Sequence, residues 1–307
     1  MLKYMSEGYL IDTPENKSYI KNYASLYEAY QQDRILEARA IVCDSEHNLI
    51  VDLMGIKGII PKNEGAIGID TGETRDIAII SRVNKPVCFK IISIEKDEND
   101  EPHIVLSRKK VQEECRDNYI KNLKSGDIIN AKVTHLEAFG AFVDIGAGIS
   151  SLIPIDAISV SRITHPRDRF YAGEDIRAVV KSVDETGRVS LSHKELLGSW
   201  SENANKFKAG ETVAGIVRSV EDYGIFIELA PNLAGLAEPK DNVFVGQQAS
   251  VYIKSLIPDK MKVKLIVVDS FDAEYHLPAL EYFNTADHID YWRYSPIEAN
   301  KIIETQF

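Results

Sequence analysis

An internal repeat is the feature that most constrains the fold of this 307-residue chain. Residues 125–154 and residues 209–238 share one pattern: a Gly–acidic pair, an alternating apolar run, an aromatic–Gly–x–Phe tetrad and a Gly-bearing turn. The tetrad glycines, Gly140 and Gly224, lie 84 residues apart. Each unit then ends in two further alternating runs, so the pattern predicts five short strands in about 75–85 residues.

Five short strands with Gly-bearing turns are typical of a small closed barrel of the OB type. A weaker copy of the same rhythm lies near residues 34–110, with a long excursion between its third and fourth strands. Helical patterns over residues 108–124 and 192–207 predict connectors between the copies. The expected fold class is therefore all-β dominated, with tandem five-stranded OB-type barrels joined by short helices.

The repeat and its connectors set the expected domain limits. In chain order we expect an N-terminal segment (residues 1–33), a divergent OB domain (34–110), a helical linker (111–124) and an OB domain (125–193). A second helical linker (194–208), a third OB domain (209–269) and a C-terminal tail (270–307) follow. The tail repeats nothing upstream, and Pro296 predicts a short helix beginning near that residue.

Composition excludes several classes of protein. Hydrophobic residues make up 44% and charged residues 27% of the chain, which is ordinary for a soluble protein with real cores. No stretch approaches the roughly 18 apolar residues of a membrane span, and the first residues lack the apolar run of a signal peptide. The three cysteines form no CxxC pair. We expect a cytoplasmic protein with no membrane partner, no cofactor and no metal site.

The net charge of −11 argues at first sight against a nucleic-acid partner, because phosphate repels an acidic surface. Residues 1–120 carry 16 basic against 21 acidic residues, and residues 270–307 carry 2 against 7. Residues 121–200 balance at 10 against 10, and residues 201–269 carry 8 against 9. The acidic excess lies at the two ends, so a nucleic-acid surface is expected in the middle of the chain.

The aromatic residues of the two tetrads are candidate binding residues. Phe139 and Phe142 are three residues apart, and so are Tyr223 and Phe226. Residues at this spacing share a face of a strand only where a turn or bulge intervenes, which the tetrad glycine allows. Two exposed rings offer stacking planes to unpaired bases, worth about 1–3 kcal/mol per base. A single aromatic in a barrel strand is more often a core residue, but the repeated spacing favours a binding surface.

These residues also resemble a known family. The segments FGAFVDIG, SLIP and VDETGRVSLSHKE resemble the S1 RNA-binding domain, and three such units in one chain resemble shortened bacterial ribosomal members of that family. The resemblance covers about residues 30–268; it is specific in the middle copy, moderate in the third and loose in the first. It implies a protein without enzymatic activity whose partners are single-stranded RNA, including mRNA, and the small ribosomal subunit.

The family resemblance also implies a set of RNA-binding residues. In the family, RNA is held by two aromatics on the second strand, a His on the third, and an Asp and an Arg that flank the last turn. The middle copy matches at Phe139, Phe142, Asp184 and Arg188, but it has Pro154 in place of the His. The middle copy is therefore the best expected RNA site.

The other two copies depart further from the family pattern. The third copy keeps Tyr223 and Phe226, but it has Glu238 in place of the His and Lys262 in place of the Arg. The first copy lacks the aromatic pair, because the two positions are occupied by His47 and Ile50. The third copy is expected to bind RNA, and the first to contribute little.

A basic loop before the fourth strand of the middle copy adds two further candidates. The segment SRITHPRDRF places Arg167 and Arg169 in an otherwise neutral domain, where they could contact phosphate. A solvated loop with no function would show the same composition.

Three other functions remain open at the level of sequence. The chain could be an RNA-binding regulator that never joins the ribosome. It could be a protein-interaction scaffold that uses its acidic first domain and tail. It could also be an enzyme that holds RNA through these modules, as polynucleotide phosphorylase and ribonuclease E do, although the residues after the last repeat are too few for a catalytic domain.

Overall fold

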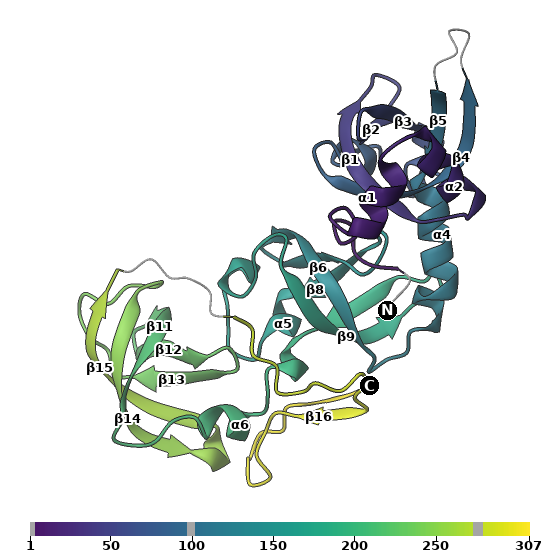
Figure 1. The fold of residues 1–307 in the computed structure, drawn as a ribbon. Coiled ribbons are helices and arrows are strands. Elements are labelled where there is room, and N and C mark those ends of the chain that lie inside the picture. Colours follow the sequence, from purple (N-terminus) through teal and green to yellow (C-terminus); the bar gives the residue numbers. More distant parts are fainter. Residues whose placement is uncertain (1–3, 97–101, 273–278) are drawn as a thin grey trace. The chain divides into compact units, whose positions relative to one another are not determined.

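The structure is a computed structural model that describes residues 4–96, 102–272 and 279–307. Within these residues the chain forms three closed five-stranded barrels and a two-stranded sheet, and Figure 1 shows the barrels as separate groups of arrows. In each barrel the strands follow one another around the wall in the order first, second, third, fifth, fourth. The prediction of tandem OB-type barrels is confirmed for all three copies, the divergent first copy included.

The first barrel is preceded by two short helices, α1 (Pro14–Ile20) and α2 (Tyr23–Gln31). Its strands are β1 (Leu36–Cys43), β2 (Leu49–Leu53), β3 (Ile56–Ile60), β4 (Pro86–Lys96) and β5 (Pro102–Ser107). The long excursion between β3 and β4 holds the 3₁₀ turn η1 (Lys62–Glu64) and the short helix α3 (Ile77–Ile80). Leu26 of α2, Ile79 of α3 and Phe89 of β4 are fully buried in one apolar cluster, so the helices help to close this core.

The middle barrel contains the more regular copy of the repeat. Its strands are β6 (Ile128–Glu137), β7 (Gly140–Asp144), β8 (Ser150–Pro154), β9 (Asp175–Val183) and β10 (Val189–Ser192). Between β8 and β9 lie the short helix α5 (Ile155–Ile158) and the 3₁₀ turn η3 (Pro166–Asp168). The parallel pairing of β8 with β10 through Leu152 and Ser190 closes the wall.

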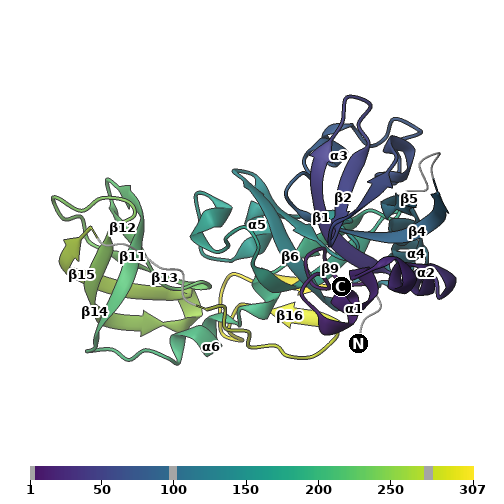
Figure 2. The ribbon, with the colours of Figure 1, turned by 45° about the horizontal axis from the view of Figure 1, so that its top comes forward.

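The third barrel has three strands of ten residues each. Its strands are β11 (Thr212–Glu221), β12 (Gly224–Ala230), β13 (Leu233–Ala237), β14 (Gln248–Ile257) and β15 (Lys262–Phe271), with the 3₁₀ turn η5 (Pro258–Lys260) before β15. Burial alternates along β15, where Val263, Leu265 and Val267 point into the core and the residues between them are exposed. Figure 2 shows β14 and β15 side by side in this barrel.

The connectors are shorter helices than the sequence predicts. After the first barrel, α4 (Arg108–Asn118) is capped by the Ser107 side chain and is followed by the 3₁₀ turn η2 (Ile120–Asn122). After the middle barrel, the expected helix over residues 194–208 is two pieces, η4 (Lys194–Leu196) and α6 (Trp200–Ala204). Gly198, with a φ of 82°, separates them, because a left-handed residue cannot continue a helix.

The C-terminal tail differs from its prediction. No helix begins near Pro296; instead β16 (Tyr291–Arg293) pairs with β17 (Glu304–Gln306) in an antiparallel ribbon. Tyr294 packs in the apolar cluster of the third barrel. Ile289 packs with Ile128 and Val179 of the middle barrel. The tail therefore completes the cores of two barrels, which anchors it in an extended conformation.

The chain divides into two compact units. Unit 1 is Met1–Asn122 with Asp144–Ser150, and unit 2 is Leu123–Val143 with Ser151–Phe307. Among the described residues, no helix is long and apolar enough to cross a membrane. In the same residues, no three His, Cys, Asp or Glu side chains are grouped so that they could hold a metal ion.

Candidate nucleic-acid interface

The middle barrel presents the first aromatic pair on its outer surface. Phe139 lies in the turn between β6 and β7 and is 57% exposed, whereas Phe142 on β7 is half-buried. Their ring centroids are 5.9 Å apart and the ring planes are nearly perpendicular, at 89°. Neither ring belongs to the barrel core, whose β7 contributions are Ala141 and Val143. Each ring can therefore offer a face to a ligand from solvent.

Gly140 makes this arrangement possible because a residue without a side chain lets strands β7 and β8 approach closely. A Cβ atom at Gly140 would lie only 2.5 Å from the carbonyl oxygen of Ile153 on the neighbouring strand β8. The sequence suggested that Gly140 supplies backbone freedom, but its φ is not in the left-handed region. The glycine is needed because no side chain fits between β7 and β8 at this point.

His135 joins the aromatic pair, and the sequence interpretation missed it. This exposed residue of β6 lies nearly parallel to the Phe142 ring, with centroids 6.3 Å apart and planes at 27°. Its Nε2 atom is 2.6 Å from a carboxylate oxygen of Glu137. A strand-pairing argument could have found it, because His135 lies on the strand next to Phe142, but it is not part of the family motif.

Asp184 and Arg188 flank the turn between β9 and β10. The Asp184 carboxylate accepts hydrogen bonds from the hydroxyl and backbone N–H of Thr186 and from the backbone N–H of Arg188. These hydrogen bonds, led by that of the Thr186 hydroxyl, lower the pKa of Asp184. Asp184 therefore shapes the turn. Within the described residues the Arg188 guanidinium has no hydrogen-bond or ion-pair partner, so it is free to meet a phosphate.

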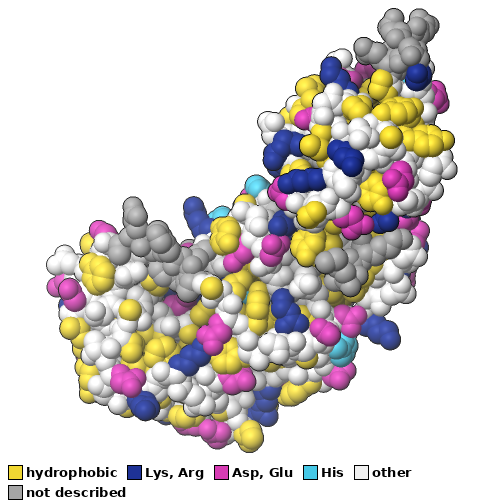
Figure 3. Space-filling view, in the orientation of Figure 1, with side chains coloured by type: hydrophobic (Ala, Val, Ile, Leu, Met, Phe, Trp, Pro, Cys, Tyr) yellow, Lys and Arg dark blue, Asp and Glu magenta, His cyan; other side chains and the backbone are white. Residues whose placement is uncertain are grey.

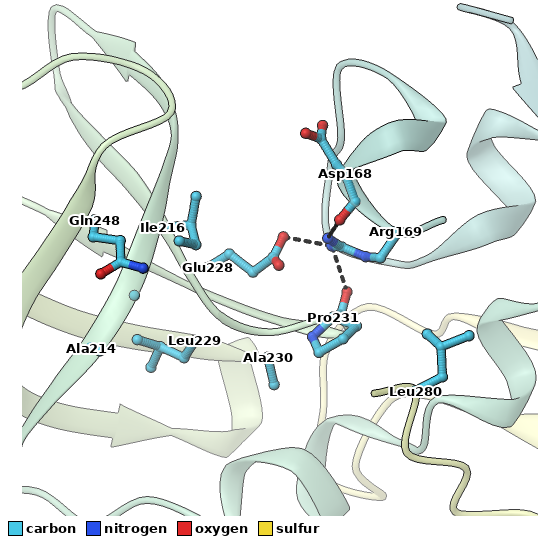
Figure 4. A pocket seen from close by; sticks show the side chains of 11 residues that line it. Asp168, Arg169, Ala214, Ile216, Glu228, Leu229, Ala230, Pro231, Gln248 and Leu280 are labelled. Carbon is cyan, nitrogen blue, oxygen red and sulfur yellow. Dashed lines mark hydrogen bonds and ion pairs between the residues drawn. The ribbon is translucent and has the colours of Figure 1, made fainter. Parts of the chain in front are cut away.

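The two arginines of the basic loop have different surroundings. Arg167 is exposed, and its guanidinium has no partner among the residues that the structure describes. Arg169 is buried, and its Nη2 atom lies 2.5 Å from the Glu228 carboxylate and 3.3 Å from the Pro231 carbonyl oxygen. Figure 4 shows the guanidinium pointing at Glu228. The expectation that Arg169 contacts RNA is wrong for this structure: the residue pairs with the third barrel.

The third barrel carries the second aromatic pair in almost the same geometry. Tyr223 is 67% exposed and Phe226 is half-buried, with centroids 6.1 Å apart and planes at 85°. A Cβ atom at Gly224 would lie 2.6 Å from the carbonyl oxygen of Ala237. The two tetrads therefore work in the same way, by closing the second strand onto the third. Lys262, at the start of β15, is exposed.

Strand register defines a row of side chains on the outside of each barrel, which we call the outer row. The row contains one residue from each of the first, second, third and fifth strands, and each of these residues pairs with the next residue of the row. In the third barrel these residues are Ser219, Phe226, Leu236 and Lys264. Their neighbours along the strands, such as Ile225 and Val263, are buried in the core. The outer row therefore holds one aromatic ring, with a lysine at its far end.

The same row can be followed in the other barrels. In the middle barrel, the 84-residue repeat and the pairing of Leu152 with Ser190 give His135, Phe142, Leu152 and Ser190. In the first barrel the register gives Val42, Ile50, Ile59 and Val105. His47, at the place of the exposed tetrad aromatic, lies 3.0 Å from Asp76. The first barrel therefore has an aliphatic outer row and no stacking ring.

Comparison with known families agrees with this geometry. The family model of the S1 RNA binding domain matches residues 122–194, which are the middle barrel with its adjoining connectors. The middle barrel is therefore similar to the S1 RNA binding domain. Within the matched residues, Phe142 lies on β7 and Phe139 in the turn before it, and Asp184 and Arg188 flank the turn before β10.

Similarity to complete proteins extends over more of the chain. The small ribosomal subunit protein bS1 of Staphylococcus aureus (strain COL) is 29% identical over 264 residues, which are 80% of this chain and 64% of that protein. The same protein of Staphylococcus haemolyticus (strain JCSC1435) is 28% identical over the same shares. The chain thus resembles bS1 along most of its length, and the match spans less than two thirds of these relatives.

Solved structures give shorter or weaker matches. The solution structure of GSP13 from Bacillus subtilis is 29% identical, covers 23% of this chain and 55% of that chain, and has a TM-score of 0.22. A multidomain protein with nucleic acid binding domains from Streptococcus pneumoniae is 14% identical over 78% of this chain and 75% of its own, with a TM-score of 0.25. TM-scores this low support no functional conclusion.

Proposed function

We propose that this protein binds single-stranded RNA through stacking on the aromatic pairs of its middle and third barrels, as a non-enzymatic protein of translation. The observation that carries the proposal is that both pairs lie outside the core with matching geometry, at 5.9 Å and 89° in one barrel and 6.1 Å and 85° in the other. Two copies of an exposed ring pair have no role in packing, so a ligand with flat apolar faces explains them best.

The geometry favours single strands over duplexes. The two rings of each pair are nearly perpendicular, so they cannot lie against one continuous stack of bases. A duplex also hides its base faces between neighbouring pairs, whereas an unpaired strand can turn one base toward each ring. Stacking requires no particular base, so we expect little sequence preference.

Charge and similarity support the same function. Arg188 lies just before β10 of the middle barrel and Lys262 begins β15 of the third; both are exposed and can contact phosphates. Figure 3 shows basic and acidic side chains interspersed on the face of the third barrel that it presents, so local contacts must outweigh the bulk charge. The family of the middle barrel is named for RNA binding, and the similar bS1 proteins are named for the small ribosomal subunit, which we propose as a partner.

Titration of the full chain with a labelled single-stranded RNA and with a duplex of equal length tests the proposal. We expect the single strand to bind more tightly. The variant Phe139→Ala/Phe142→Ala should lose at least about tenfold in affinity, because each stacked base contributes about 1–3 kcal/mol. A matched control, Tyr9→Ala/Tyr27→Ala, removes two exposed aromatics far from the outer rows in sequence and should bind normally. Equal affinity for duplex, or no binding at low salt, contradicts the proposal.

The aliphatic outer row of the first barrel favours a second function, contact with a protein. Val42 is 47% exposed, and the other three residues of the row are half-buried. An apolar row in a region with an acidic excess suits a partner whose basic surface has an apolar centre. Cosedimentation of the chain with purified small ribosomal subunits, before and after Ile50→Asp with Val105→Asp, tests this function. Loss of cosedimentation with retained RNA binding supports it, and unchanged cosedimentation contradicts it.

A further inference from the structure

The last two strands of the third barrel carry Lys262, which stands at the family's Arg position, and two lysines that the family pattern does not include, Lys254 and Lys264. Lys264 is the last residue of the outer row, in register with Leu236, which pairs with Phe226. Lys262 lies two residues earlier on the same face of β15. Lys254 lies on β14 in the bulge between Ile253 and Ser255, opposite Leu265 and Lys264. We call these three residues the lysine edge.

All three lysines of this edge are exposed and unpaired within the described part of the chain. No ion pair or side-chain hydrogen bond there involves Lys254, Lys262 or Lys264. Lys240 is different, because its ammonium donates to the carbonyl oxygens of Val267 and Val268. The strand spacing places neighbouring members of the edge roughly 5–7 Å apart at the backbone. Three like charges held so close, without a counterion from the protein, favour an extended anion.

The acidic residues nearby give the site a direction. Glu238 is exposed and directly follows Ala237, which pairs with Leu265. Glu238 therefore lies toward one end of the aromatic pair, and the start of β15 lies toward the other end. Asp259 lies in the turn before β15. A phosphate chain is repelled by Glu238 and attracted by Lys264 and Lys262. The backbone of a strand whose bases stack on Tyr223 and Phe226 is therefore drawn to the β14–β15 side.

We propose that the lysine edge of the third barrel binds the phosphate backbone of single-stranded RNA, while its aromatic pair binds the bases. This inference rests on the proposed function and adds a division of roles between the barrels. The middle barrel has Lys181 and Arg188 at the places of Lys254 and Lys262, but Ser190 at the place of Lys264. The lysine edge therefore holds three cations where the middle barrel has two at the corresponding positions.

Salt dependence of RNA affinity tests the lysine edge. The probe is a labelled oligouridylate of about 30 nucleotides, long enough for two OB folds at roughly 4–16 nucleotides each. The full chain and its variant Lys254→Gln/Lys262→Gln/Lys264→Gln are titrated at several salt concentrations. Each phosphate contact contributes about −0.7 to the log–log slope, so the slope should become shallower by about 2. The loss of affinity should approach 100-fold at about 0.1 M salt and vanish toward about 1 M.

A matched variant removes the same charge from elsewhere. Lys57→Gln/Lys85→Gln/Lys301→Gln neutralises three exposed lysines outside the third barrel and should leave the slope nearly unchanged. If both triple variants change the slope equally, net charge is the cause and the lysine edge is not a binding site. An unchanged slope in the first variant, with wild-type RNA binding intact, overturns the inference alone and points to an acidic protein as the ligand. Failure of the wild-type chain to bind RNA overturns the proposed function itself.

Discussion

The first and third barrels have the same strand order and corresponding register, yet their outer rows differ at three of four positions in side-chain chemistry. The outer row of the first barrel consists of Val42, Ile50, Ile59 and Val105. The corresponding residues of the third barrel are Ser219, Phe226, Leu236 and Lys264. The buried residues between them remain aliphatic in both. The barrel is therefore specified by its alternating interior, and the half-exposed row is free to change function without changing the fold.

The difference extends to the cationic edge. At the bulge of the fourth strand, Ile92 of the first barrel takes the place of Lys254, and on the fifth strand His103 takes the place of Lys262. Missing rings and missing cations thus coincide in the same barrel. At these positions the first barrel therefore lacks both features on which the proposed RNA binding of the third barrel rests.

Removal of all four tetrad rings should have the largest effect on this comparison. The variant Phe139→Ala/Phe142→Ala/Tyr223→Ala/Phe226→Ala loses up to four stacked bases, at about 1 kcal/mol or more each, so affinity for single-stranded RNA should fall about a thousandfold. Truncation of the first barrel's row by Ile50→Ala/Val105→Ala should change affinity by less than about twofold. Fluorescence anisotropy measures both. Equal losses in the two variants would erase the distinction between the barrels.

The two loop arginines offer a test of the next largest effect. Arg169 shares Glu228 with Arg218; Arg169 and Glu228 are both buried, and Arg218 is half-buried. Arg169→Leu should therefore destabilise the fold by about 2–3 kcal/mol, less than for a fully orphaned partner because Arg218 still neutralises Glu228. Arg167→Leu should leave stability unchanged and weaken RNA binding. Urea unfolding and RNA titration of both variants check this; stability losses of equal size would contradict it.

The sequence predicts the barrels well because their signal is local: alternation, a Gly-bearing tetrad and a repeat. Positions that depend on a distant partner are different. Arg169 could not be separated from Arg167, since Glu228 lies 59 residues away. His135 and Lys264 become recognisable only when strand register places them beside Phe142 and Leu236. Tyr294 lies in a segment without a repeat, so no sequence pattern indicates that it packs in the core of the third barrel.

Two buried groups, one in each unit, should contribute to stability in acid with opposite signs. In unit 1, burial raises the pKa of Glu37 from 4.5 to about 7, so the folded chain takes up a proton before the unfolded chain does and gains stability as the pH falls from 7 toward 4.5. In unit 2, burial lowers the pKa of His193 from 6.5 to about 4, so only the unfolded chain is protonated between those values and stability falls. Each effect is about 1–2 kcal/mol between about pH 7.5 and pH 5.5.

The chain carries its own probes for this test. Both tryptophans, Trp200 and Trp292, lie in unit 2, and all three cysteines lie in unit 1. Urea unfolding followed by tryptophan fluorescence reports on unit 2, and labelling of the buried thiols Cys88 and Cys115 reports on unit 1. His193→Gln should remove most of the acid loss from the fluorescence transition and leave the thiol transition unchanged. Parallel shifts of both transitions with pH would contradict the assignment.

The smallest expected effect concerns deletion of the first barrel. Residues 1–120 carry 21 acidic against 16 basic residues and no stacking ring in the barrel's outer row, so their removal should not weaken RNA binding. The sequence predicts that residues 121–269 alone bind at least as well as the full chain, but that fragment lacks Ile289 and Tyr294, which complete the cores of unit 2. The fragment of residues 121–307 is therefore the better test.

We expect the affinity of this fragment for single-stranded RNA to equal that of the full chain at moderate salt and to exceed it by up to about threefold at low salt, where repulsion from the acidic residues is least screened. Tryptophan fluorescence verifies that the fragment is folded, because both tryptophans are retained. Titration of one labelled RNA at two salt concentrations measures the difference. A folded fragment that binds tenfold more weakly would show that the first barrel contacts RNA through residues outside its aliphatic row. The first and third barrels would then both bind RNA, and they would differ only in the side chains that they use.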